Sequence, residues 1–73
     1  INMRDKIEAL KRLSPVLREI AQKWEERQKV EEALGIPTSD ALTYQFILQD
    51  VPENLGNDIL KNVKETMGML YGG

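Results

Sequence analysis

Few side chains in this 73-residue chain have the chemistry that catalysis needs. The sequence contains no histidine and no cysteine, so it lacks the commonest general base, the thiol nucleophile and the commonest transition-metal ligands. The serines are Ser14 and Ser39, and there is no histidine to activate either of them. Both serines stand where helix-capping residues are expected. We therefore predict that the protein is not an enzyme.

Carboxylates are plentiful, but their spacing does not suit a metal or cofactor site. Glu25 and Glu26 are adjacent in sequence, and adjacent residues of a helix point about 100° apart. Oxygen-bearing side chains occur around Gly56, between Asp50 and Asp58. Their spacing does not match that of an EF-hand calcium loop. The sequence therefore predicts neither a metal nor a cofactor.

Two features indicate binding rather than catalysis. Trp24, the only tryptophan, lies at the end of an apolar face, and tryptophan is enriched at interface hot spots. A tryptophan in this position also suits the core of a monomer. The second feature is the basic row, which we define as Arg4, Lys11 and Arg18, and which Glu25 continues at the same interval. Such a row either selects the partner in a helix pair or forms a solvated face.

The elements that hold these side chains in the first half of the chain are predicted to be helices. The residues of one face are separated alternately by four and three positions, which is the spacing of an amphipathic helix. They are Met3, Ile7, Leu10, Ser14, Leu17, Ala21, Trp24 and Gln28. Pro15 is unfavourable inside a helix, whereas Ser14-Pro15 is a good N-cap and first position. The sequence therefore predicts helices over about 3–13 and 15–34, and a single kinked helix is the alternative.

Gly35 and Pro37 predict the end of the second helix, because glycine adopts the left-handed conformation that follows many helices. Thr38-Ser39-Asp40 offers N-capping side chains, and a third helix is predicted over about 40–50. Residues 42–48 also alternate in the manner of a strand. A single strand would have no partner within this chain. We favour a helix for this segment, with a strand as the alternative.

A last helix is predicted over about 52–70, because Pro52 suits a first helical position. Its apolar stripe consists of Leu55, Ile59, Val63, Met67 and Leu70, with Leu60 beside it. Gly56 inside this helix suggests that another helix approaches closely there. Between this stripe and the 3–24 face we expect the side chains of Leu42, Phe46 and Leu48. The resulting fold class is all-α: one helical domain over 1–73, built as a small bundle of three to four short helices.

Composition limits the functional classes further. Hydrophobic residues make up 41% of the chain and the net charge is only -2, which argues against a disordered polyelectrolyte. A pI near 5.0 does not favour attraction of the whole molecule to nucleic acid. No apolar run approaches the ~20 residues of a membrane span, and no leader pattern begins the sequence. We expect a cytoplasmic protein that does not enter a membrane.

Leu13, Val16 and Ile20 widen the 3–24 face, which is then wide for a chain of this size to cover by itself. We therefore predict a non-catalytic helical protein–protein interaction or assembly module that self-associates, as a homodimer, through this face, with another helical protein as the alternative partner. The predicted partner-binding residues are Leu10, Leu17 and Trp24, with the basic row Arg4, Lys11 and Arg18 selecting the partner. The alternative is a small nucleic-acid-binding regulator in which the basic row contacts phosphates.

Overall fold

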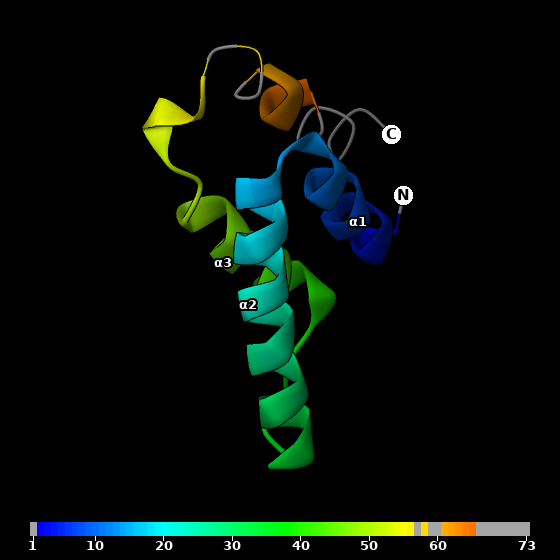
Figure 1. Cartoon of the computed structure of the whole chain (residues 1–73). Helices are drawn as coiled ribbons and strands as arrows, with labels where there is room; N and C mark the ends of the chain where they lie inside the picture. The colour runs from blue at the N-terminus through cyan, green and yellow to red at the C-terminus, as the bar shows by residue number, and fades with distance from the viewer. Residues whose placement is uncertain (1, 57, 59–60, 66–73) are drawn as a thin grey trace.

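The protein is built from short helices, shown in a computed structural model that describes residues 2–56, 58 and 61–65 (Figure 1). The helices are α1 (Met3–Leu13), α2 (Pro15–Ala33), α3 (Asp40–Gln49) and the 3-10 helix η1 (Glu53–Leu55). Residues 61–65 are helical as well. No strand occurs among these described residues, so the all-α prediction is confirmed and segment 42–48 is a helix.

The boundaries of α1 and α2 follow from local capping. The side chain of Asn2 accepts a hydrogen bond of 2.9 Å from the backbone N–H of Arg4. Ser14 is extended and separates the two helices, and its Oγ accepts a bond of 3.1 Å from the N–H of Leu17. Pro15 occupies the first turn of α2, where its missing N–H needs no partner. The break at Ser14-Pro15 is therefore confirmed, and the single kinked helix is not formed.

The end of α2 is equally local in origin. Gly35 has a φ of 75°, the left-handed conformation that a residue without a Cβ adopts easily. The N–H of Ile36 donates to the carbonyl of Glu31 at 2.8 Å, and the N–H of Gly35 donates to that of Glu32 at 3.1 Å. These two bonds form a Schellman motif, which satisfies the last carbonyls of the helix. Ser39 then caps α3 by accepting from the N–H of Leu42.

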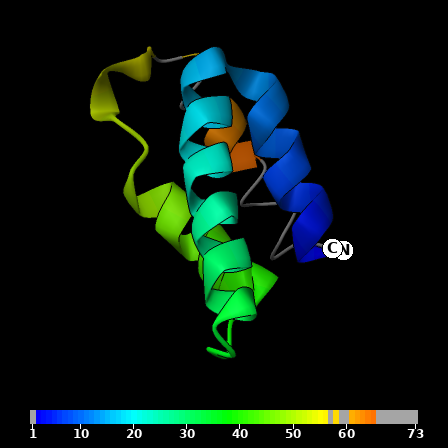
Figure 2. The same cartoon turned by 60° about the horizontal axis from the view of Figure 1, so that its bottom comes forward.

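Helices α1 and α2 lie side by side as an antiparallel hairpin, and α3 packs against both (Figure 2). Because α2 is longer, its C-terminal end extends beyond α1 (Figure 1). One apolar cluster fills the space between the elements: Ile7, Leu10, Leu17, Ala21, Tyr44, Ile47 and Val63. The regularly spaced face of α1 and α2 is thus covered by the chain's own α3 and by the segment that carries Val63.

Two predictions about the second half of the chain were wrong. The last helix does not begin at Pro52, which is extended and precedes the short η1. Gly56 follows with a φ of 107°, and a backbone in that conformation cannot continue a helix. A Cβ at Gly56 would meet no atom within 4 Å, so backbone conformation rather than close helix approach explains this glycine. Of the expected stripe, Leu55 and Val63 pack in or against the core, whereas Ile59, Leu60, Met67 and Leu70 lie outside the described residues.

The prediction that Leu42, Phe46 and Leu48 fill the middle of the bundle was correct only in part. Leu48 packs against the core cluster, and Phe46 is half-buried beside Trp24. Leu42 is exposed instead. On α3 the fully buried positions are those of Tyr44 and Ile47, and Leu42 lies on a different side of this helix because it is two residues before Tyr44.

Candidate functional site

The predicted contact residues Leu10 and Leu17 lie in the core of the chain. Both side chains are completely buried, together with Ile7 and Ala21 on the same face. A partner cannot touch them while the fold is intact. Trp24, at the end of that face, is only partly buried. Self-association was predicted because the 3–24 face was expected to be too wide for one chain to bury. In the structure, Tyr44 and Ile47 of α3 and Val63 pack against this face within the same chain.

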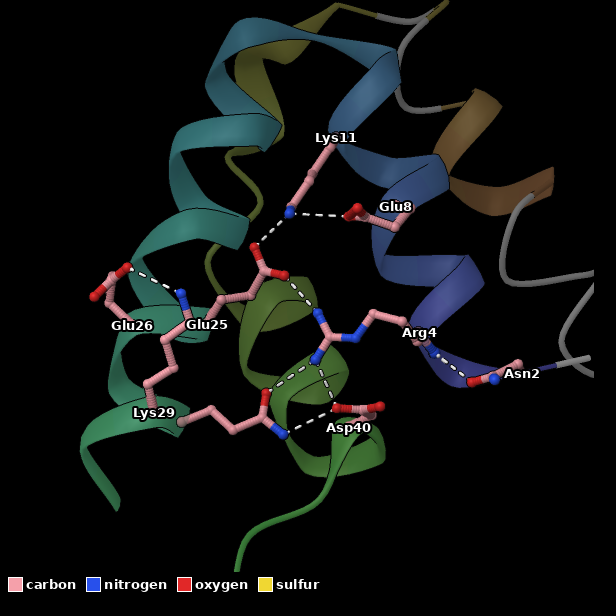
Figure 3. A network of polar contacts seen from close by, with 9 residues as sticks. Asn2, Arg4, Glu8, Lys11, Glu25, Glu26, Lys29 and Asp40 are labelled. Carbon is pink, nitrogen blue, oxygen red and sulfur yellow. Dashed lines mark hydrogen bonds and ion pairs between the residues drawn. The ribbon is translucent and has the colours of Figure 1, made fainter. Parts of the chain in front are cut away.

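Arg4, the first member of the basic row, joins three helices. Its guanidinium forms an ion pair with Glu25 of α2, and its Nη2 lies 2.7 Å from Asp40 Oδ1 of α3 (Figure 3). The same nitrogen donates to Gln28 Oε1 at 3.2 Å, and Gln28 Nε2 donates to Asp40 Oδ1 at 2.9 Å. We call Arg4, Glu25, Gln28 and Asp40, with Lys11 and Glu8, the polar clasp. The polar clasp links α1, α2 and α3 on one side of the bundle.

Lys11 belongs to the same clasp. Its Nζ contacts the second carboxylate oxygen of Glu25 and lies 2.9 Å from Glu8 Oε2 (Figure 3). Glu25 is therefore shared between two cations that lie two turns apart on α1. The clasp follows from the hairpin, because antiparallel packing of α1 and α2 brings residue 25 opposite residues 4 and 11. In the sequence these residues looked like one continuous row of charges.

The clasp changes the proton affinities of its members. The hydrogen bond from Gln28 and the ion pair with Arg4 lower the pKa of Asp40 below its usual value. The hydrogen bond from Lys11 lowers the pKa of Glu8. On the cationic side, the bond to Asp40 raises the pKa of Arg4. Each charged form is stabilised by an opposite charge or a hydrogen bond.

The basic row is therefore divided between two environments. Arg4 and Lys11 are held by carboxylates of their own chain, whereas Arg18 is exposed on α2. Arg4 and Lys11 are therefore less available to a phosphate backbone than Arg18 is. This arrangement gives little support to nucleic-acid binding through the row.

Trp24 forms a second cluster, at the other end of α3 from Asp40. Its ring stacks on Phe46 of α3, with the centroids 4.6 Å apart and 13° between the planes. Its indole N–H donates to Asp50 Oδ2 at 2.7 Å, and this bond lowers the pKa of Asp50. Lys23 Nζ lies 4.9 Å from the centroid of the same ring and 3.3 Å from Asp50 Oδ2. The cluster fixes the C-terminal end of α3 to the middle of α2.

Next to Trp24 the surface of α2 is hollowed. The hollow has a volume of about 310 Å³ and is lined by Lys23, Trp24, Glu26, Arg27 and Val30. A second hollow of about 430 Å³ lies beside the polar clasp, and Lys11, Gln22, Glu25, Glu26 and Lys29 line it. The second hollow is lined by charged and amide side chains alone, so the hollow at Trp24 is the one that suits an apolar side chain.

Several large apolar side chains are exposed, and those at the C-terminal end of α2 form a surface that the sequence analysis did not identify. Leu34 is 70% exposed and Val30 is 53% exposed. The other large apolar side chains with high exposure are Val16, Ile36 and Leu42. Three of the five belong to α2 or its cap, on a side of the helix away from the core. The sequence did carry a signal for them, since Val16, Ile20, Lys23, Arg27, Val30 and Leu34 are also spaced alternately by four and three.

No protein-family model, curated protein or solved structure matches this chain. Within the part of the chain that the structure describes, no group of three or more acidic side chains could hold a metal ion. In the same part, no helix is both long enough and apolar enough to cross a membrane.

Proposed function

We propose that the protein is a non-catalytic helical module that acts by binding another protein. The observation that carries this proposal is the group of exposed apolar side chains on α2, above all Val30 and Leu34. Contiguous apolar surface is uncommon on small monomeric proteins and marks interaction sites. The hollow at Trp24 lies beside these residues, and a half-buried tryptophan beside a hollow is a typical interface anchor.

The core and the polar clasp are both satisfied within one chain, and this favours another surface for the binding role. The apolar face over 3–24 is covered within the chain, and the charges of the clasp are paired across three helices. Neither feature needs a second copy, so the proposed binding surface is the outer side of α2 instead of the 3–24 face. The scaffold then serves to hold that surface rigid, which lowers the entropy lost on binding.

Photo-crosslinking tests the proposal. A photoreactive amino acid is placed at one exposed position at a time, in the cells that make the protein. The positions are Arg18, Gln22, Lys29, Val30, Leu34, Gln45 and Lys64, all of which are exposed. We expect adducts with protein at a contiguous subset of these positions. Adducts with nucleic acid alone, or no adduct at any position, would contradict the proposal.

A further inference from the structure

The outer side of α2 carries a regular pattern of side chains. Val16, Ile20, Lys23, Arg27, Val30 and Leu34 are spaced so that they fall on one line along the helix. We call these six residues the outer stripe. The stripe spans nearly the whole of α2, about 27 Å at the rise of an α-helix. It lies beside the face that includes the buried Leu17 and Ala21 and the partly buried Trp24.

The chemistry of the outer stripe changes along its length. Apolar side chains occupy both ends. Exposed Val16 and Ile20, which is partly buried against the core, lie at one end, and exposed Val30 and Leu34 lie at the other. Two cations, Lys23 and Arg27, occupy the middle, and each side chain is 67% exposed. The hollow of about 310 Å³ lies at this middle part and is lined by Lys23, Trp24, Glu26, Arg27 and Val30. Glu26 is the one acidic side chain of this lining, and Lys29 on the next turn pairs with it. The stripe therefore offers apolar, basic and apolar surface in that order.

We infer that the outer stripe binds an amphipathic helix of a partner protein, whose contact face is apolar at both ends and carries carboxylates in the middle. This inference rests on the proposed function and specifies its surface and its partner. Helices bind to such surfaces through side chains spaced by three and four residues. One large apolar side chain of the partner fits the hollow beside Trp24, and carboxylates reach Lys23 and Arg27.

A second copy of this chain fits the outer stripe poorly. In an antiparallel pairing that places Val16 against Leu34, Lys23 of one copy faces Arg27 of the other. In a parallel pairing each cation faces its own equivalent. Both arrangements place like charges opposite one another at the centre of the interface, which is destabilising. A partner helix with carboxylates opposite Lys23 and Arg27 has no such repulsion, because both cations then face opposite charges.

The internal ion pairs of these cations do not prevent such contacts. Lys23 contacts Asp50, and Arg27 contacts Glu31 through Nε at 3.3 Å. Both pairs involve highly exposed cations, and exposed pairs contribute little. A guanidinium also has further N–H donors that can bind a second carboxylate. The internal ion pairs therefore position Lys23 and Arg27 and leave both able to bind carboxylates of a partner.

Two synthetic helical peptides test the inference. Both have leucines at the two ends of the contact face, and the middle of that face carries glutamates in one peptide and lysines in the other. Neither contains an aromatic residue, so the emission of Trp24, the only tryptophan, reports binding. We expect the acidic peptide to shift this emission and to bind at least about tenfold more tightly than the basic one. Its affinity should fall as salt is added.

Variants of the stripe make the test specific. The double variant Lys23→Glu with Arg27→Glu should reverse the preference, so that the basic peptide binds more tightly. Leu34→Ser should weaken the binding of the acidic peptide about tenfold without lowering the melting temperature, because Leu34 is exposed. Lys29→Glu is the matched control, since Lys29 is exposed on another side of α2, and it should leave the preference unchanged.

Three results would overturn the inference: neither peptide binds, both bind equally well, or charge reversal fails to change the preference. The crosslinking experiment separates these failures from failure of the proposed function. Protein adducts at Gln22 or Gln45, with none at Val30 or Leu34, would retain a binding module and reject the outer stripe. Absence of adducts at every position would reject both.

Discussion

Arg4 and Asp40 are 36 residues apart in sequence, yet Arg4 Nη2 lies 2.7 Å from Asp40 Oδ1. The contact joins the second residue of α1 to the first residue of α3, and Gln28 of α2 bonds to both partners. A single hydrogen-bonded group thus fixes the relative positions of three helices. The surface of α2 that we propose for binding depends on this arrangement, since α1 and α3 hold α2 from two sides.

The contact between Arg4 and Asp40 should stabilise the fold measurably. We expect a coupling free energy of about 1 kcal/mol in a double-mutant cycle of Arg4→Met and Asp40→Asn, because both side chains are partly exposed and solvent screens the pair. Urea denaturation of the four proteins gives the value. The control is the pair Lys29–Glu26, in which both side chains are about three-quarters exposed, and its cycle should give a coupling near zero. Equal couplings for both pairs would show that the clasp has no special role.

Acid should destabilise the protein through the same clasp. The folded state lowers the pKa of Asp40 and of Glu8, so at low pH the unfolded state binds more protons than the folded state. Above about pH 5 these two carboxylates make their full contribution to the free energy of unfolding. The contribution is lost as the pH falls below the ordinary carboxyl pKa values near 4. In Asp40→Asn the free energy of unfolding should depend less steeply on pH in the acidic range. The check is a series of denaturation curves between neutral and acidic pH, and an unchanged slope in Asp40→Asn would contradict the assignment.

Local chemistry explains why most helix boundaries were predictable. At Ser14-Pro15 and at Ser39, a side-chain hydroxyl accepts a backbone N–H three residues later, and this interaction requires only neighbouring residues. Pro52 was misjudged by analogy with Pro15. The residue before Pro52 is Val51, whose side chain has no oxygen to accept a capping hydrogen bond, and η1 has no side-chain cap. The proline alone did not suffice to start a long helix.

The polar clasp was not predictable in the same way, because it depends on tertiary structure. The sequence placed Glu25 in register with Arg4, Lys11 and Arg18, and that row was interpreted as a surface for a partner. The turn at Ser14 folds α2 back along α1, so that Glu25 becomes the internal partner of Arg4 and Lys11. The outer stripe was overlooked for a related reason. Its spacing runs alongside that of the buried face, and the exposures of Val16, Val30 and Leu34 distinguish the two.

Leu17 and Trp24 should differ in their importance for stability. Leu17→Ala removes a completely buried side chain and should lower the free energy of unfolding by about 3 kcal/mol, through lost burial and a cavity. Trp24→Ala should cost about 2 kcal/mol, since the ring is only partly buried but stacks on Phe46 and bonds to Asp50. Chemical denaturation measures both. Trp24→Phe keeps the stacking and loses the hydrogen bond, so it should fall between the wild type and Trp24→Ala.

The two capping serines should also differ. Ser14 is buried and Ser39 is exposed, although each accepts one backbone N–H at 3.1 Å. In Ser14→Ala the N–H of Leu17 is left without a partner away from water, so the loss should be about 1–2 kcal/mol. In Ser39→Ala water can replace the hydroxyl, and the loss should be about 0.5–1 kcal/mol. Thermal denaturation compares them, and an equal or reversed order would show that burial does not govern these caps.

Gly35 and Gly56 allow the backbone itself to be tested, because both have positive φ and open space where a Cβ would be. Any cost of Gly→Ala at these sites therefore comes from backbone conformation alone. Gly35 is in the left-handed region, where alanine costs about 1 kcal/mol. Gly56 has φ of 107° and ψ of 148°, a region nearly restricted to glycine, so Gly56→Ala should cost about 2 kcal/mol or should shift the connection after η1. Gly35→Asn should cost less than Gly35→Ala, since asparagine tolerates the left-handed conformation. Urea denaturation of the three variants gives the order, and a smaller loss for Gly56→Ala than for Gly35→Ala would mean that the backbone at residue 56 relaxes to another conformation.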